Sequence, residues 1–175
     1  MKSKSTNNFF NFSDRKDLVA VLKPELSISF KELFEQSNQI AFLLSHKGIK
    51  KDNYIPLLID DNLLFIKTVI ALWFLGAIPV PLNTRLLDDE IKSTLDDFDF
   101  KFLVTDKKSS FNLSKNELGI IDFNKITSEN DETQSFSIPI WEKEAVVIFT
   151  SGSTGRPKGV VHTFSSLINL SLIHI

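Results

Sequence analysis

The sequence predicts an α/β fold in which short strands alternate with helices around a layer of parallel strands. Between residues 26 and 105, apolar strand-like runs alternate with segments of helical periodicity. Several of the helical segments are bounded by capping residues and glycines, which mark helix ends. The chain has 175 residues, of which 42% are hydrophobic and 24% charged, as expected for a globular domain with one core.

The first predicted elements are two short strands and a helix. Strands are expected at 18–22 and 26–28, and Ser29 with Glu32 then forms a capping box. Apolar and small residues recur at helical spacing until Gly48, namely Phe30, Leu33, Phe34, Ser37, Ile40, Ala41 and Leu44. We therefore expect a helix that ends at Gly48.

A strand is expected at 54–59, and the apolar segment 63–75 after it reads as a buried helix too short to span a bilayer. The residues between them, Asp60, Asp61 and Asn62, are interpreted as helix caps rather than metal ligands. A further helix is expected with one face made by Leu87, Ile91, Leu95 and Phe98 and an acidic first turn, followed by a strand at 102–105.

Residues 106–144 are interpreted as an irregular connector with one extra strand. Lys, Ser, Asn, Asp and Glu dominate it, and apolar islands occur only at 119–123 and 138–141. The connector delivers the chain to a β-branched strand at 146–149.

This strand runs directly into a loop of small hydroxyl residues, glycines and a lysine, which predicts a nucleotide-phosphate site. Glycines let backbone N–H groups turn inward, hydroxyls donate hydrogen bonds, and lysine adds a mobile positive charge. The candidate binding residues are Thr150, Ser151, Gly152, Ser153, Thr154, Gly155 and Lys158.

Three alternatives account for this loop less well. A flexible Gly/Ser surface loop is disfavoured because apolar strand-like segments flank it on both sides. A Walker-type loop needs Gly before and Ser or Thr after the lysine, but Lys158 lies between Pro157 and Gly159. The spacing of a serine-hydrolase elbow is also absent.

Residues 149–160 resemble the phosphate-binding signature of the adenylate-forming superfamily, which includes acyl-CoA synthetases, aryl-CoA ligases, luciferases and peptide-synthetase adenylation domains. The resemblance implies that the loop holds the β- and γ-phosphates of ATP while a substrate carboxylate attacks the α-phosphate. It extends through Gly76 to Asn83, so residues 1–175 resemble an incomplete N-terminal subdomain of such an enzyme, a partial AMP-binding domain.

Two segments, 82–86 and Thr163-Phe164, resemble the o-succinylbenzoate CoA ligases of menaquinone biosynthesis. Medium-chain acyl-CoA synthetases carry similar Asn-x-Arg-Leu segments, and a surface pairing of Arg85 with Asp88 or Asp89 is the structural alternative. The resemblance implies a small-molecule carboxylate, ATP with Mg²⁺, and CoA. A non-catalytic nucleotide-binding module is the alternative from another class.

Composition and single residues exclude several other functions. A net charge of −2 gives no basic footprint for nucleic acid, and the absence of cysteine excludes disulfides and thiol catalysis. The polar N-terminus lacks the apolar stretch of a signal peptide, so a cytoplasmic location is expected. His162 is interpreted as structural, with no catalytic role.

The resemblance places the adenine pocket, the Mg²⁺-binding acid, the ribose-binding aspartate and the catalytic lysine downstream of this chain, which is therefore expected to be inactive alone. Residues 170–175 are expected to be non-native. They coincide with one reading frame of a common transposon-end sequencing adapter, CTG TCT CTT ATA CAC ATC.

Overall fold

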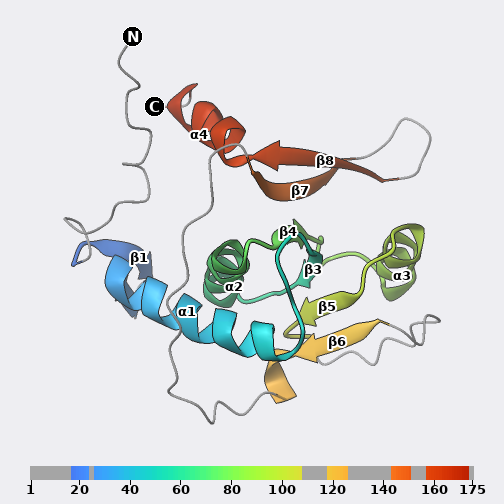
Figure 1. Ribbon diagram of the computed structural model, residues 1–175, viewed down its shortest axis with the longest axis horizontal. Coiled ribbons are helices and arrows are strands. Elements are labelled where there is room, and N and C mark those ends of the chain that lie inside the picture. Colours follow the sequence, from blue (N-terminus) through green and yellow to red (C-terminus); the bar gives the residue numbers. More distant parts are fainter. Residues whose placement is uncertain (1–16, 24–25, 108–117, 126–142, 151–156, 174–175) are drawn as a thin grey trace.

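The computed structural model describes residues 17–23, 26–107, 118–125, 143–150 and 157–173 (Figure 1). The apolar island at 138–141 and the loop residues 151–156 lie outside these ranges. The elements are, in order, β1 (Val19–Lys23), β2 (Leu26–Ser29), α1 (Phe30–His46), β3 (Tyr54–Leu58), α2 (Asn62–Leu75), β4 (Ile78–Pro81), α3 (Asp88–Asp97), β5 (Phe102–Thr105), β6 (Gly119–Asp122), η2 (Phe123–Lys125), β7 (Glu144–Thr150), β8 (Lys158–Thr163) and α4 (Phe164–Ile173).

A four-stranded parallel sheet forms the centre of the described structure, in the order β4-β3-β5-β6. Helix α2 connects β3 to β4, and α3 connects β4 to β5 on the other side of β3. The predicted α/β class with parallel strands is therefore confirmed. The extra strand expected within 106–144 is β6, which pairs with β5 from Phe102–Gly119 to Thr105–Asp122.

Helices cover both faces of this sheet (Figure 1). Helices α1 and α2 pack on one face, where Ile55 and Leu57 of β3 are fully buried. Helix α3 packs on the other face through Ile91 and Leu95, which contact Leu58. Strand β3 is apolar on both faces because a parallel sheet lies between two helical layers.

The helix ends follow the predicted caps. Ser29 and Glu32 form the capping box of α1, and the Asp61 carboxylate accepts a hydrogen bond from the N–H of Leu64 at 2.7 Å. Gly76 ends α2 in the left-handed conformation, with φ of 67°. The interpretation of Asp61 as a cap is confirmed. None of the helices in the described ranges is long and apolar enough to cross a membrane.

One predicted helix face needs correction. Leu87 is 72% exposed, because it lies before the first residue of α3 and its side chain does not reach the core. Its backbone N–H donates a hydrogen bond to the Glu90 carboxylate. Phe98 follows the last helical residue and packs beyond the helix, against Phe149. Only the two central positions, Ile91 and Leu95, face the core as expected.

The remaining strands form two antiparallel hairpins, β1–β2 and β7–β8. Hairpin β7–β8 lies beside β4, and Figure 1 shows it with α4, in red, on one side of the four-stranded sheet. Val147 joins the two layers by packing against Ile78 and Val80. The sequence predicted strands here but not their antiparallel pairing.

Candidate functional site

The two described residues that bound the candidate phosphate loop are cross-strand partners. Thr150 ends β7, Lys158 begins β8, and their Cα atoms are paired in the hairpin register. The Thr150 hydroxyl donates a hydrogen bond to the Lys158 carbonyl at 3.4 Å. The hairpin therefore closes the loop of residues 151–157 at its base.

Both of these residues are exposed. Within the described part of the chain, no carboxylate forms an ion pair with the Lys158 ammonium. A lysine in this position keeps its charge available for an external anion. The other candidate residues, Ser151, Gly152, Ser153, Thr154 and Gly155, lie outside the described residues.

The strand residues next to this base pack tightly across the hairpin. Phe149 is paired with Gly159, and Val147 lies two residues before Phe149 on the same face. A Cβ atom on Gly159 would lie 3.0 Å from Cγ1 of Val147 and 3.5 Å from Cε1 of Phe149. Glycine at this position lets the Phe149 ring lie over the neighbouring strand.

The Phe149 ring also contacts the segment after α3. Its centroid lies 5.1 Å from that of Phe98, with 54° between the ring planes. Phe98 in turn lies 5.7 Å from Phe100, which packs with Val147, Ile78 and Val80. This aromatic group attaches the loop end of the hairpin to the parallel sheet.

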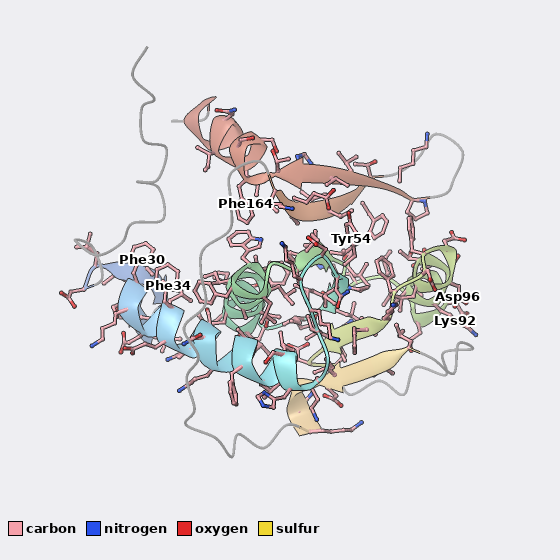
Figure 2. All side chains as sticks on the ribbon, in the orientation of Figure 1. Phe30, Phe34, Tyr54, Lys92, Asp96 and Phe164 are labelled. Carbon is pink, nitrogen blue, oxygen red and sulfur yellow. The ribbon has the colours of Figure 1, made fainter. Side chains whose placement is uncertain are left out.

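The opposite end of the hairpin is attached through polar contacts. The Trp73 indole of α2 donates a hydrogen bond to the Ala145 carbonyl at 2.7 Å, and the Tyr54 hydroxyl donates one to the Glu144 carboxylate. Phe164 is 2% exposed and packs edge-on against Trp73 with centroids 5.1 Å apart. Figure 2 shows the labelled side chains of Tyr54 and Phe164 between the hairpin and the sheet.

The hydrogen bond from Tyr54 has an electrostatic consequence. The carboxylate of Glu144, together with partial burial, raises the pKa of Tyr54 from 10.0 to about 12. The phenol therefore keeps its proton to a higher pH than an ordinary tyrosine does, and it remains a donor to Glu144 over that range.

The carboxyl edge of a parallel sheet is the usual place for nucleotide phosphates in α/β folds. Here Asp106, which follows β5, accepts hydrogen bonds from the N–H groups of Asp60 and Asp61 at 2.9 Å each. The Lys107 ammonium donates to the Thr84 carbonyl and lies 3.9 Å from Asp60. The chain's own carboxylate binds the backbone donors in front of α2, so this edge does not offer them to a phosphate.

Two other residues considered in the sequence have clear positions. His162 lies on β8 opposite Val146, and its lack of a catalytic role stays a prediction. Among the described residues, Arg85 forms no ion pair with Asp88 or Asp89, so the surface pairing considered for it is not found. The backbone N–H of Arg85 donates a hydrogen bond to Oδ1 of Asn83 at 3.0 Å.

Sequence reasoning missed the residues that attach the hairpin to the parallel sheet. Phe98 was predicted as a helix-face residue, and Trp73 and Tyr54 as ordinary members of an apolar helix and a strand. The available signal was the polar atom that each of Trp73 and Tyr54 carries, since a partly buried indole or phenol requires a hydrogen-bond partner. No local pattern identifies that partner, because Ala145 and Glu144 lie 72 and 90 residues away.

Comparison with known proteins identifies the class. The profile of the AMP-binding enzyme family matches residues 10–174, and the chain belongs to this family. The predicted resemblance to the adenylate-forming superfamily is confirmed.

Two relatives of known name show how similar this chain is to individual members of the family. The chain is 30% identical over 151 residues to a 2-succinylbenzoate–CoA ligase of Bacillus cereus (strain ZK / E33L), covering 86% of this chain and 30% of the relative. It is 31% identical over 176 residues to bacitracin synthase 2 of Bacillus licheniformis, covering 96% of this chain and 6% of that protein. The chain thus spans about a third or less of these relatives' lengths.

Solved structures of adenylate-forming enzymes have the same fold as the described part of this chain. The O-succinylbenzoate coenzyme A synthetase of Bacillus subtilis, in complex with AMP, superposes with a TM-score of 0.80 at 26% identity, covering 92% of this chain and 44% of that chain. The N-terminal subdomain of Klebsiella oxytoca NpsA, in complex with 3-hydroxybenzoyl-AMSN, superposes with a TM-score of 0.76 at 21% identity. The match covers 87% of this chain and 38% of that chain. The described fold is that of the N-terminal subdomain of adenylate-forming enzymes.

Proposed function

We propose that the protein containing this chain is an ATP-dependent acid–CoA ligase with o-succinylbenzoate as its acid. The observation that carries the proposal is the hairpin base, where Thr150 and Lys158 close a loop of hydroxyls and glycines. The likeness to 2-succinylbenzoate–CoA ligase and the segments 82–86 and 163–164 support the choice of acid.

In this proposal the loop binds the β- and γ-phosphates of ATP. Hydroxyl and backbone N–H groups of residues 150–155 donate to the phosphate oxygens, and the Lys158 ammonium follows the charge of the departing group. An oxygen of the substrate carboxylate attacks the α-phosphorus, and the bond to pyrophosphate breaks with its electron pair on pyrophosphate. The acyl-adenylate then reacts with the thiol of CoA, which forms the thioester and releases AMP.

Mg²⁺ accompanies ATP in this chemistry and neutralises phosphate charge. The described residues contain no group of three or more metal-binding side chains, and the carboxylates of Asp61 and Asp106 are already engaged by backbone N–H groups. These described residues do not form a dedicated metal site, and the proposal assigns to this chain the phosphate contacts alone.

Pyrophosphate exchange in the complete protein tests the phosphate assignment. Lys158→Ala removes a charged hydrogen bond and should weaken adenylate formation by about 1 to 3 kcal/mol, or about 5- to 150-fold in rate. Lys143→Ala is the matched control, because Lys143 is an exposed lysine at the opposite end of the same hairpin. An exchange rate in Lys158→Ala equal to that of Lys143→Ala would refute the assignment.

A panel of carboxylic acids with ATP and CoA tests the substrate. Turnover of o-succinylbenzoate supports the proposal, whereas turnover of medium-chain fatty acids alone would move the protein to the medium-chain acyl-CoA synthetases. The likeness to bacitracin synthase 2 favours a second candidate, an adenylating enzyme of another kind. Amino acids therefore belong in the panel.

A further inference from the structure

The hairpin that carries the candidate loop is attached to the parallel sheet at two separate places. At the loop end, Phe149 packs against Phe98, and Phe149 is directly bonded to Thr150 at the base of the loop. At the other end, Trp73 binds the Ala145 carbonyl. Thr150 lies five positions beyond Ala145 on the extended strand, which is about 17 Å at about 3.3 Å per residue.

These two attachments differ in their chemistry and in what they constrain. Phe98 is half-buried and follows α3, so its ring projects from a fixed helix end against Phe149. On the neighbouring strand the Phe149 ring has only Gly159 opposite it, where no side chain competes for the space. The Phe149 ring is therefore confined between Phe98 and β8.

We propose that Phe98 is a positioning residue for the phosphate loop, acting through Phe149. Thr150 cannot shift without moving the backbone of Phe149, and the Phe98 ring limits that movement. The inference rests on the proposed function, since it assumes that residues 150–158 bind the β- and γ-phosphates of ATP. Phe98 is assigned no contact with the nucleotide.

Separate titrations of the complete protein with ATP and with AMP test this. AMP lacks the β- and γ-phosphates. A displaced loop should therefore weaken the binding of ATP and leave the binding of AMP unchanged. Phe98→Ala removes the aromatic pair with Phe149, together with the pair that Phe98 forms with Phe100, and the Kd for ATP should rise about threefold to tenfold. Phe98→Tyr keeps the ring and should restore the Kd for ATP to within about twofold of wild type.

Trp73→Phe is the matched control, because it loosens the same hairpin at the end remote from the loop. It removes the hydrogen bond to Ala145 and should lower the melting temperature while the ratio of the ATP and AMP dissociation constants stays at the wild-type value. A loss of ATP affinity in Trp73→Phe as large as that in Phe98→Ala would assign the effect to general loosening and overturn the proposal.

The remaining outcomes are also decisive. A Kd for ATP unchanged in Phe98→Ala, or equal weakening of ATP and AMP, overturns the positioning role while leaving the proposed function intact. Absence of ATP binding by the wild-type protein overturns both. If Phe98→Ala does not fold, Phe98→Leu replaces it, because leucine keeps apolar volume without a ring. The ratio of its dissociation constants for ATP and AMP is then compared with that of the wild type.

Discussion

Substitution of Gly159 by alanine tests the packing beneath the candidate loop. A Cβ atom at this position would lie 3.0 Å from Cγ1 of Val147 and 3.5 Å from Cε1 of Phe149. Carbon atoms in contact normally lie about 3.5 to 4.0 Å apart, so Val147 must move by about half an ångström. The same movement pushes on the strand that ends at Thr150.

Two opposing terms set the size of the effect. Overpacking a tight contact costs about 1 to 3 kcal/mol. Alanine restricts the unfolded chain, which returns about 0.4 to 1 kcal/mol where the native backbone conformation suits it. Gly159 has no positive φ, unlike Gly48 and Gly76. The net expectation is a loss of about 0.5 to 2 kcal/mol in the free energy of unfolding.

The assay combines thermal unfolding with ATP titration of the complete protein. Gly119→Ala is the control, because a Cβ there would lie 3.2 Å from Cδ1 of Phe102, in the parallel sheet and away from the hairpin. Both variants should lose stability, and only Gly159→Ala should also lose ATP affinity.

A double-mutant cycle with Val147→Ala identifies the contact responsible. Val147→Ala removes Cγ1, so the added Cβ at Gly159 should cost less in that background than in the wild type. Equal costs in both backgrounds would refute the reasoning, because the predicted crowding would then not be the cause.

Three further predictions concern other contacts and the end of the chain. The stabilisation from the raised pKa of Tyr54 is present below pH 10.0 and is lost as the pH rises towards about 12, so Tyr54→Phe should lack this alkaline loss; the same alkaline profile in both proteins would contradict it. Asp61→Ala should cost about 1 kcal/mol in urea denaturation by removing the cap of α2, whereas Asp61→Ser should retain most of it. Amplification of the locus across the codon for Asn169 should show a genomic sequence that departs from residues 170–175, and the same residues followed by a stop codon would refute the adapter interpretation.

Most of the fold was predictable because its signals are local. The capping box of Ser29 and Glu32, the cap at Asp61 and the stop at Gly76 fix helix ends within a few residues of sequence. Alternation of strands and helices then requires parallel strands, since each helix carries the chain back to the same end of the sheet. The antiparallel pairing of β7 with β8 was not predicted, because it depends on the path of the loop between them.

The candidate site was predictable only in part. The residue types of the loop follow from phosphate chemistry, and the structure places its two ends, Thr150 and Lys158, side by side. The supports of the loop depend on contacts between distant segments, such as Phe98 with Phe149. A periodicity that assigns Phe98 to a helix face cannot show that the helix ends one residue earlier.

The contacts of Asp106 favour the proposed phosphate site at the hairpin over one at the carboxyl edge of the parallel sheet. A phosphate at the carboxyl edge of the sheet would have to displace a carboxylate that binds the N–H groups of Asp60 and Asp61. Each such charged hydrogen bond contributes about 1.5 to 3 kcal/mol, and the displaced carboxylate would repel the phosphate that replaced it. At the hairpin, by contrast, the described Lys158 ammonium has no carboxylate partner to lose. Phosphate binding at the hairpin therefore avoids a cost that the edge of the sheet imposes.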